Sequence, residues 1–337
     1  MTAPLLRVTD LTKRFPLKGT LFGKGGVVHA VDGVSFDVRA GETLGIVGES
    51  GCGKSTTARL VMRLIEPDEG RIALEGREIG HPQGVALVEA RRAMQMVFQD
   101  SFASLNPRLT VETSIAFAPR VHGVAEPAAR ATAHDLLRKV GLDPARFAGR
   151  YPFELSGGQR QRINIARALA LSPKLVILDE AVSALDKSVE AQVLNLLLDL
   201  KSELGLTYIL ISHDLNVVQY VSDRVMVMYL GKVVEIGPVE RIYGSTAHPY
   251  TRALLSAMPS MDPAHRTEVP PLQGDPPNPI NPPSGCRFRT RCPFAEHVCA
   301  AREPLLGALE AGHHVACHMA HAGSGHTQAP HGAARAA

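Results

Sequence analysis

The apolar residues of the chain follow two recurring patterns, and each pattern predicts a different kind of element. Short apolar runs bounded by turn residues predict buried strands, whereas apolar positions at helical spacing predict helices. The predicted strands are 43–47, 70–74, 94–98, 175–178, 208–211 and 225–228. The predicted helices are 54–64, 112–140 (interrupted at 122–123 and 127), 159–171 and 189–204. Because buried strands and helices alternate, we expect an α/β fold with a largely parallel sheet.

Three segments depart from this alternation. An Asp-Gly pair at 32–33 predicts a turn between a strand at 27–31 and a strand at 34–38. Residues 259–284 are rich in proline, which predicts a linker or an extended segment. The stretch 322–337 is rich in Gly, Ala and His, and we expect it to be disordered because it has little to bury.

The composition narrows the classes of protein. The chain has 36 Lys and Arg against 33 Asp and Glu, and its net charge of +3 is too small to indicate a nucleic-acid-binding surface. No apolar run reaches the roughly 18 residues that a membrane-spanning helix needs. Asp10 and its polar neighbours interrupt the region where a signal peptide would be apolar. We therefore expect a cytosolic protein that binds no nucleic acid.

A glycine-rich loop follows the strand at 43–47 and precedes the helix at 54–64. It fits the pattern G-x-x-x-x-G-K-[S/T], whose glycines let backbone N–H groups point at phosphate oxygens beside a helix N-terminus. Its residues are Gly48, Glu49, Ser50, Gly51, Cys52, Gly53, Lys54 and Ser55. Lys54 can reach the β- and γ-phosphates of a nucleotide, and Ser55 can bind Mg²⁺. We expect Cys52 to pack beneath the loop rather than to react.

Two further segments suit nucleotide chemistry. The strand at 175–178 ends in Asp179, which can hold Mg²⁺, and Glu180, which can orient or deprotonate a water. A second glycine-rich turn opens the helix at 159–171 and exposes backbone N–H groups there. Its residues are Leu155, Ser156, Gly157, Gly158 and Gln159. One nucleotide would not obviously need both glycine-rich segments of the same chain, so the pair suggests a second subunit.

The order of these motifs resembles the ATP-binding subunits of ABC transporters. The match runs from residue 5 to about 255, and it implies that 1–255 form the ATP-binding domain. The motifs, in the family's order, are the phosphate loop, Gln99, 155–159, 179–180, 183–186 and His213. The resemblance implies an ABC-type P-loop NTPase domain with a RecA-like core, an antiparallel β subdomain and a helical subdomain at about 100–170. It also implies that two such domains pair head to tail, with ATP held between the phosphate loop of one and 155–159 of the other.

By the same resemblance, several residues gain a role around the bound nucleotide. Gln99 matches the glutamine that touches Mg²⁺ and senses the γ-phosphate, so Mg²⁺ would be held by Ser55, Gln99 and Asp179. His213 matches the switch histidine that contacts the γ-phosphate and positions Glu180, the residue that would activate water. These matches imply an ATPase with Glu180 and His213 as catalytic residues.

Four other positions carry less specific signals. Thr56 continues the ATP-binding loop into its helix, and Asp186 matches the loop that communicates across the dimer. Phe15 is the candidate for the aromatic residue that stacks on adenine, but it could equally be a core residue. Ala181 departs from the family, which usually has proline after the catalytic glutamate. Because both carboxylates are present, we expect hydrolysis to survive this change.

Other segments resemble the oligopeptide/dipeptide permease branch of the family. They are 94–100, 103–108, 182–186, 191–195 and 248–251. The chain is similar to the F-type ATPase of that branch, which implies a D-type ATP-binding subunit as its partner. The branch also implies two transmembrane permease subunits, docked near Gln99 and 100–150, and an external solute-binding protein. The chain would then be a peripheral subunit at the cytoplasmic face of the inner membrane.

Four of the five cysteines lie in the segment 256–321, which resembles the C-terminal extension of the same branch. Their spacing is C-x5-C-x6-C-x17-C, and they are Cys286, Cys292, Cys299 and Cys317. Four thiolates in a small, proline-rich, cytosolic segment indicate a structural metal centre. Zinc sites usually have closer cysteine pairs, whereas Cys292 followed by proline is similar to the Cys-Pro of some ferredoxins.

The resemblance favours a [4Fe–4S] cluster at these cysteines, and zinc or unmetallated thiols remain the alternatives. Nearby histidines could substitute as ligands, although we expect them to be surface residues. They are His297, His313, His314 and His318.

These features together predict the ATP-hydrolysing subunit of an ABC importer for di- or oligopeptides. Similar ATPases serve nickel, glutathione or opine-like solutes, and the sequence does not distinguish among them. A soluble ABC protein of DNA repair or translation is the alternative class. Such proteins usually carry two ATPase domains in one chain or large inserted arms, and neither occurs here. Glu180 and His213 argue against a regulatory module that no longer hydrolyses ATP.

Overall fold

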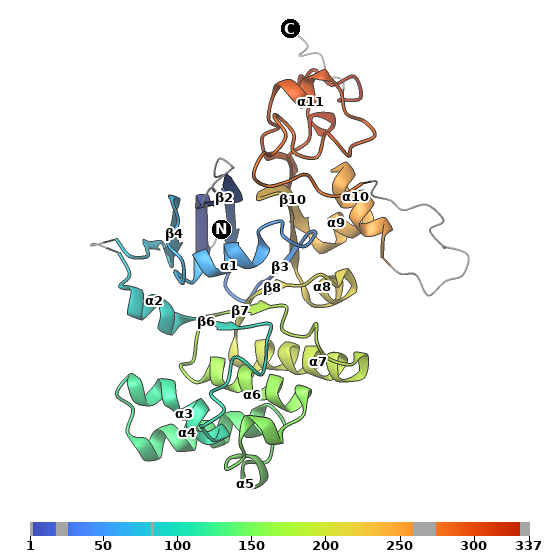
Figure 1. The fold of residues 1–337 in the computed structure, drawn as a ribbon. Helices are drawn as coiled ribbons and strands as arrows, with labels where there is room; N and C mark the ends of the chain where they lie inside the picture. The colour runs from blue at the N-terminus through green and yellow to red at the C-terminus, as the bar shows by residue number, and fades with distance from the viewer. Residues whose placement is uncertain (1–2, 18–25, 82–83, 259–273, 331–337) are drawn as a thin grey trace, which may run out of the picture.

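The computed structural model describes all residues except 1–2, 18–25, 82–83, 259–273 and 331–337, and it contains two β-sheets (Figure 1). In spatial order, the large sheet consists of β11 (Gly307–Glu310), β12 (His313–Val315), β10 (Lys232–Pro238), β9 (Arg224–Tyr229), β3 (Thr43–Val47), β8 (Thr207–Ile211), β7 (Leu175–Asp179) and β6 (Met94–Val97). The small sheet consists of β2 (Val27–Val38), β1 (Leu6–Pro16), β4 (Glu69–Leu74) and β5 (Arg77–Glu78). All six predicted strands are present, each within one residue of its expected ends.

The large sheet is parallel from β9 through β3, β8 and β7 to its edge strand β6. Every residue of β3, β7 and β8 is buried, as expected for strands covered on both faces. Alternate residues of β7 enter two different cores, because successive side chains of a strand point to opposite faces. Val176 and Leu178 join the helical core, whereas Leu175 and Ile177 join the core shared with the small sheet. The predicted α/β class is confirmed.

The helices surround this sheet and also form a separate lobe (Figure 1). They are α1 (Lys54–Val61), α2 (Leu87–Ala93), α3 (Val111–Val121), α4 (Glu126–Lys139), α5 (Pro144–Phe147), α6 (Gly157–Leu169), α7 (Lys187–Leu204), α8 (Leu215–Val221), α9 (Val239–Gly244), α10 (Pro249–Ser256) and α11 (His297–Ala301). The lobe contains α3, α4 and α5, and α6 connects it to the sheet. This lobe falls within the expected helical part at about 100–170.

The small sheet corrects one prediction. Residues 27–38 form the single strand β2 rather than two strands joined by a turn. Gly33 adopts a φ of +71°, and its N–H donates to the hydroxyl of Thr12 at 3.1 Å. The pairing of β1 with β2 shifts register at this point without reversing direction. The Asp-Gly pair therefore marks an irregularity inside a strand, of the kind that a bulge produces.

A second prediction is corrected within the helical lobe. Pro127 does not interrupt a helix but lies in the first turn of α4, where a missing N–H costs no hydrogen bond. The interruption between α3 and α4 falls at 122–125, which contains the predicted His-Gly break. Thr110 begins α3, and its hydroxyl accepts a hydrogen bond from the N–H of Thr113.

The C-terminal extension shares the large sheet with the ATP-binding part of the chain. β12 pairs antiparallel with β10, so that Glu235 faces Val315 across the ladder. The Glu235 carboxylate is completely buried and accepts hydrogen bonds from the N–H groups of Ala247 and His248 at 2.8 and 3.1 Å. His313 Nε2 lies 2.9 Å from the same carboxylate. The two parts are therefore joined by a continuous ladder and by a buried polar cluster.

The expected disordered tail, 322–337, is partly described. The imidazole of His326 is buried, with Nε2 lying 2.9 Å from the carbonyl oxygen of Phe294, and the N–H of Thr327 donates to Glu296 at 3.0 Å. These hydrogen bonds attach the described part of the tail to the extension at His326 and Thr327, while most residues of 322–330 are exposed. The remainder of the tail, and much of the expected proline-rich linker at 259–284, lie outside the described residues.

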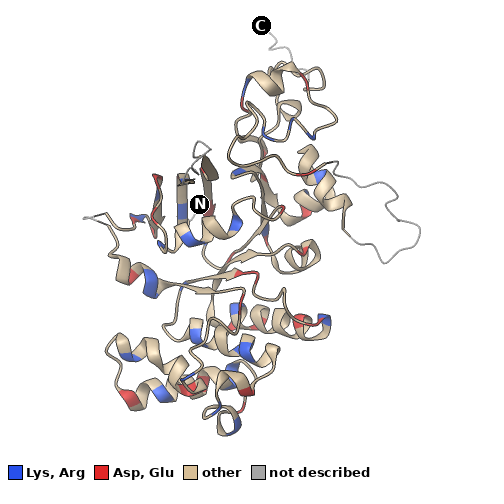
Figure 2. Cartoon of the chain, viewed as in Figure 1, with Lys and Arg blue, Asp and Glu red and all other residues tan. Residues whose placement is uncertain are grey.

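The charged residues are spread over the described chain. Figure 2 shows Lys and Arg interspersed with Asp and Glu along the helices. Within the same part of the chain, no helix is both long and apolar enough to cross a membrane.

Candidate active site

The phosphate loop connects β3 to α1, in the context that the sequence predicts. Gly48, Gly51 and Gly53 have φ values of +149°, +77° and +107°, which residues with side chains rarely adopt. A Cβ atom on Gly48 would lie 2.2 Å from the backbone oxygen of Met228. The curl of the loop therefore requires glycine, both for its backbone angles and for its close packing on β9.

Lys54 and Cys52 lie beneath this loop. The Lys54 ammonium is buried and donates to the carbonyl oxygens of Gly48 at 2.7 Å and Glu49 at 3.0 Å. Cys52 is only 3% exposed, and burial raises the pKa of its thiol. A buried thiol with a raised pKa is a poor nucleophile, which agrees with a packing role for Cys52.

Ser55 and Asp179 meet at the start of α1. The Ser55 hydroxyl donates to Oδ1 of Asp179 at 2.8 Å, which brings the phosphate loop and the end of β7 together. Burial raises the pKa of the Asp179 carboxyl, and the hydrogen bond from Ser55 opposes this effect. A hydroxyl beside a carboxylate is a donor set that suits Mg²⁺, which prefers oxygen ligands. Thr56, the next residue of α1, is half-buried.

Two predicted residues contact the carboxylate of a third, Glu180, directly after β7. Gln99 Nε2 donates to Oε2 of Glu180 at 2.7 Å, and His213 Nδ1 lies 3.6 Å from the same oxygen. Glu180 adopts a φ of +49°, an unfavourable angle for a residue with a side chain. Its N–H donates to the carbonyl oxygen of Ile211 at 2.9 Å, which anchors this turn to β8. Strained residues held by their surroundings are typical of functional sites.

The second glycine-rich segment forms the start of α6. Ser156 and Gln159 form a capping box, in which each side chain binds the backbone N–H of the other at 3.3 and 3.0 Å. Ser156 is exposed, Leu155 is buried, and Gly157 is half-buried. A Cβ atom on Gly158 would lie 2.5 Å from the Val189 side chain, so α6 packs closely on α7 there. This exposed helix start can accept an anion.

Phe15 and Asp186 lie apart from these groups. Phe15 is 37% exposed on β1, with the Lys13 ammonium 5.6 Å from its ring centroid, so it is not a core residue. Asp186 is exposed directly before α7, and its side chain does not cap the helix. Neither side chain forms a hydrogen bond or ion pair with the phosphate loop among the described residues. Ala181 is buried in the helical core, and Ser183 Oγ donates to the Glu180 carbonyl at 2.9 Å.

The four C-terminal cysteines line one small cavity of about 10 Å³, close to the space that a single water needs. Burial raises the pKa of Cys286 to about 12 and that of Cys317 to about 11. Burial also raises the pKa of Cys292, and Cys299 is itself buried. In the part of the chain that the structure describes, no three His, Cys, Asp or Glu side chains are positioned to hold a metal ion together.

The expectation of surface histidines is wrong for two of the four. His313 is buried against Glu235, and His318 is buried beside the cysteine cavity. Hydrogen bonding explains both positions, because His318 Nε2 also lies 3.0 Å from the Arg302 carbonyl oxygen. His297 is exposed, as expected.

Two residues that sequence reasoning did not place in the site contact the phosphate loop. The N–H of Glu49 donates to the Tyr250 hydroxyl at 2.9 Å. The Arg291 guanidinium donates to both carboxylate oxygens of Glu49, at 2.8 and 3.1 Å. In the sequence, Arg291 was marked only by its position before Cys292, and Tyr250 only by its place in the 248–251 segment. Neither signal shows a contact across more than 200 residues of sequence.

The phosphate loop, the Ser55–Asp179 pair and the Gln99–Glu180–His213 cluster define a phosphate-loop ATPase. Residues 31–183 match the family model described as ABC transporter, and residues 234–299 match the one described as oligopeptide/dipeptide transporter, C-terminal region. The chain belongs to the ATP-binding proteins of ABC transporters, in the oligopeptide/dipeptide branch.

Relatives are similar over almost the whole chain. The "Probable peptide ABC transporter ATP-binding protein y4tS" of Sinorhizobium fredii is 53% identical over 322 residues, which cover 95% of this chain and 91% of that protein. The "Oligopeptide transport ATP-binding protein AppF" of Bacillus subtilis is 50% identical over 321 residues, which cover 94% of this chain and 97% of that protein.

Solved structures agree with this assignment over the ATP-binding part. The structure of cbiO1 from Clostridium perfringens, part of the ABC transporter complex cbiONQ, has a TM-score of 0.62 and 27% identity, covering 72% of this chain and 92% of that one. The dimeric ATP-binding cassette MJ0796 bound to ADP and Pi has a TM-score of 0.60 and 28% identity, covering 69% of this chain and 98% of that one. The predicted fold class is confirmed.

Proposed function

We propose that this protein hydrolyses ATP to drive the import of di- or oligopeptides through an ABC transporter. The observation that carries the proposal is the convergence of Gln99 and His213 on Glu180, beside a complete phosphate loop. The names of the relatives, which are 53% and 50% identical, support peptides as the solute.

In this mechanism the chain binds the triphosphate with the phosphate-loop N–H groups and with Lys54, whose ammonium already spans the loop. Glu180 accepts the proton of the attacking water, and the hydroxide attacks the γ-phosphorus as the bond to ADP breaks. Gln99 and His213 orient the Glu180 carboxylate. Ser55 and Asp179, together with Gln99, would hold Mg²⁺, which neutralises phosphate charge when bound.

The exposed start of α6 supports a head-to-tail dimer. Residues 155–159 would bind the γ-phosphate of a nucleotide that sits in the phosphate loop of another subunit, because a helix start attracts anions. The proposed partner is a D-type ATP-binding subunit. Asp186 would communicate across this dimer, and the partly exposed ring of Phe15 would stack on adenine.

Family membership implies permease subunits in the membrane and a solute-binding protein. We place the chain at the cytoplasmic face, as a peripheral subunit, with two permease subunits docked near Gln99 and 100–150. The helical lobe of α3 and α4 supplies exposed apolar side chains for this contact. They include Phe117, at 57% exposed, and Val121, at 67% exposed.

Peptide import is tested with cells that lack this chain. Restoring the wild-type chain is expected to restore uptake of a labelled tripeptide, and the purified chain should bring two membrane proteins and a second ATP-binding subunit with it. Restored uptake of nickel, glutathione or an opine instead of the peptide would contradict the proposed solute. Purification of the chain without any membrane protein would support the soluble ABC class and contradict the importer role.

The four C-terminal cysteines are proposed to bind a [4Fe–4S] cluster, with zinc as the alternative. The chemistry of the donor set supports this proposal, because four free thiols line one cavity, but among the described residues no three of them are positioned to hold a metal ion together. Burial raises the pKa of the Cys286 and Cys317 thiols, whereas a bound metal would favour their thiolate forms. The small cavity means that the side chains must move apart to admit a cluster. Cys286, Cys292, Cys299 and Cys317 would be the ligands.

If the cluster is present, replacing one of its four proposed ligands should lower the iron content of the protein. We expect Cys286→Ser to lower bound iron and visible absorbance several-fold, because a hydroxyl is a poor substitute for a thiolate ligand. Iron content and absorbance spectra of anaerobically purified protein are the measurements. Cys52→Ser is the matched control and should keep its iron, since Cys52 lies in the phosphate loop. Unchanged iron in Cys286→Ser, or zinc in place of iron in the wild type, would contradict the cluster.

A further inference from the structure

The segment from Cys286 to Cys292 in the extension lies against the phosphate loop. Its last arginine, Arg291, forms a two-pronged ion pair with Glu49, with one nitrogen 2.8 Å from Oε2 and the other 3.1 Å from Oε1. The Arg291 side chain is only 6% exposed, and that of Glu49 is 21% exposed. Two parallel hydrogen bonds between partly buried charges form a strong and directional contact.

Arg291 is itself held in place by its surroundings. Its guanidinium lies 3.4 Å from the Tyr229 hydroxyl and 6.0 Å from the centroid of the same ring. Within the segment, the backbone N–H of Arg291 donates to the Phe288 carbonyl at 2.9 Å. The hydrogen bonds to Glu49 raise the pKa of Arg291, although burial opposes this. The cation is therefore fixed before any nucleotide binds.

Glu49 is fixed at three points. Its N–H donates to the Tyr250 hydroxyl at 2.9 Å, its carbonyl accepts from Lys54 at 3.0 Å, and its carboxylate accepts from Arg291. Glu49 is the second residue of the loop that receives the triphosphate. An unpaired carboxylate here would repel the phosphates, whereas a paired one does so far less.

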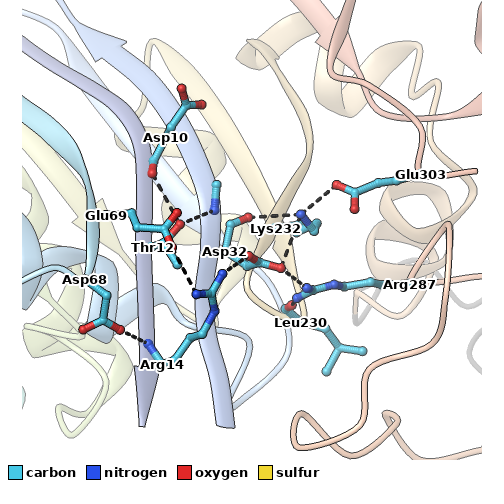
Figure 3. Close-up of polar contacts among 11 residues, drawn as sticks. Asp10, Thr12, Arg14, Asp32, Asp68, Glu69, Leu230, Lys232, Arg287 and Glu303 are labelled. Atoms are coloured by element: carbon cyan, nitrogen blue, oxygen red, sulfur yellow. Dashed lines mark hydrogen bonds and ion pairs between the residues drawn. The ribbon is translucent and has the colours of Figure 1, made fainter. Parts of the chain in front are cut away.

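The same segment also contacts residues that lie next to the loop in space. Figure 3 shows Arg287 reaching both the Asp32 carboxylate and the Leu230 carbonyl, while Lys232 bridges Asp32 and Glu303. Gly231, next to Leu230, donates its N–H to the Cys52 carbonyl at 2.8 Å. Burial raises the pKa of the Asp32 carboxyl, but the nearby Lys232 and Arg287 lower it to a net decrease.

An aromatic contact completes this attachment. The Phe288 ring lies 5.4 Å from the Tyr250 ring and 5.4 Å from the Tyr229 ring, measured between centroids. Phe288 is 2% exposed, and Tyr250 is completely buried. Tyr250 thus links the extension to the Glu49 backbone, so the segment acts on the loop as a rigid support.

We propose that Arg291 is a positioning residue for ATP binding, through which the C-terminal extension holds and neutralises Glu49 of the phosphate loop. The proposal rests on the proposed function, because it assumes that this loop binds ATP. It makes the extension part of the nucleotide site rather than a separate appendage. It also assigns a role to the residues between the first two cysteines, whatever those cysteines bind.

The test measures the Kd and KM for ATP of the full chain. We expect Arg291→Ala to raise both about tenfold, the size of a lost hydrogen bond between charged groups, with kcat at saturating ATP largely kept. Arg291→Lys keeps the positive charge but cannot form two parallel hydrogen bonds, so its Kd should lie between those of the wild type and Arg291→Ala. Adding Glu49→Gln to Arg291→Ala should restore Kd to within about threefold of the wild type, because no unpaired carboxylate remains.

The matched control is Arg241→Ala. Arg241 pairs with Glu310 at 3.0 Å, which also joins the ATP-binding part to the extension, but this exposed pair is not part of the phosphate-loop contacts. Its loss should leave Kd unchanged. A wild-type Kd in Arg291→Ala, or a double variant no tighter than Arg291→Ala, would overturn the proposal. If the wild type itself bound no ATP, the proposed function would fail instead, so the two failures are distinguishable.

Discussion

Glu180→Gln is expected to lower ATP turnover by about 10²–10⁴-fold, the usual contribution of a general base, while ATP still binds. The amide keeps the size of the carboxylate and can still hydrogen bond to Gln99, which lies 2.7 Å from Oε2. It cannot accept a proton from water. The substitution therefore removes the chemical step without removing the nucleotide site, and the proposed head-to-tail dimer should accumulate in its ATP-bound form.

This result is measured as phosphate release by the assembled transporter and as Kd for ATP of the same variant. Glu203→Gln is the matched control, because Glu203 forms an exposed ion pair with Lys139 at the far end of α7. Exposed pairs contribute little, so turnover should stay within about twofold. Unchanged turnover in Glu180→Gln would contradict the catalytic role of Glu180 and leave its contacts with Gln99 and His213 as structural.

Gly53→Ala is expected to destabilise the fold by about 3–5 kcal/mol and to abolish ATP binding. Gly53 has a φ of +107°, and a Cβ atom there would lie 2.3 Å from the Ala30 carbonyl oxygen. Because that oxygen belongs to the backbone of β2, neither partner can move aside. The loop would have to shift at the residue that precedes Lys54.

Gly51→Ala separates backbone strain from this clash. Gly51 also has a positive φ, of +77°, but a Cβ atom there would have open space around it, with no atom beyond the neighbouring residues within 4 Å. Its substitution should cost only the strain, about 1–2 kcal/mol. Thermal unfolding of both variants, with and without ATP, is the measurement. Equal losses of stability in the two variants would show that the contact with Ala30 is unimportant.

Much of the fold and of the ATP site could be predicted because the signals are local. Each buried strand of the large sheet is a short apolar run, and the phosphate loop carries its own pattern of glycines. The carboxylates at the end of β7 were predictable for the same reason, because they directly follow such an apolar run. Parallel strands bring their carboxyl ends to one edge, so Asp179 and Ser55 were expected to meet, and they do.

The remainder depended on contacts between distant parts of the chain. The Asp-Gly pair at 32–33 has the local signature of a turn, but β1 pairs along the whole of β2 and keeps it extended. From the sequence, His313 was expected at the surface, but the pairing of β12 with β10 places it beside the buried Glu235. Arg291 is 242 positions from Glu49, and no periodicity connects them.

The pairing of β12 with β10 has a consequence for how this protein can be divided. A chain that ended near residue 255 would leave the outer edge of β10 with unpaired N–H and C=O groups, next to a buried carboxylate deprived of its histidine. Such an edge is a template for pairing with other chains. We therefore expect an isolated ATP-binding part to aggregate more readily than the full chain, which carries β12 on this edge.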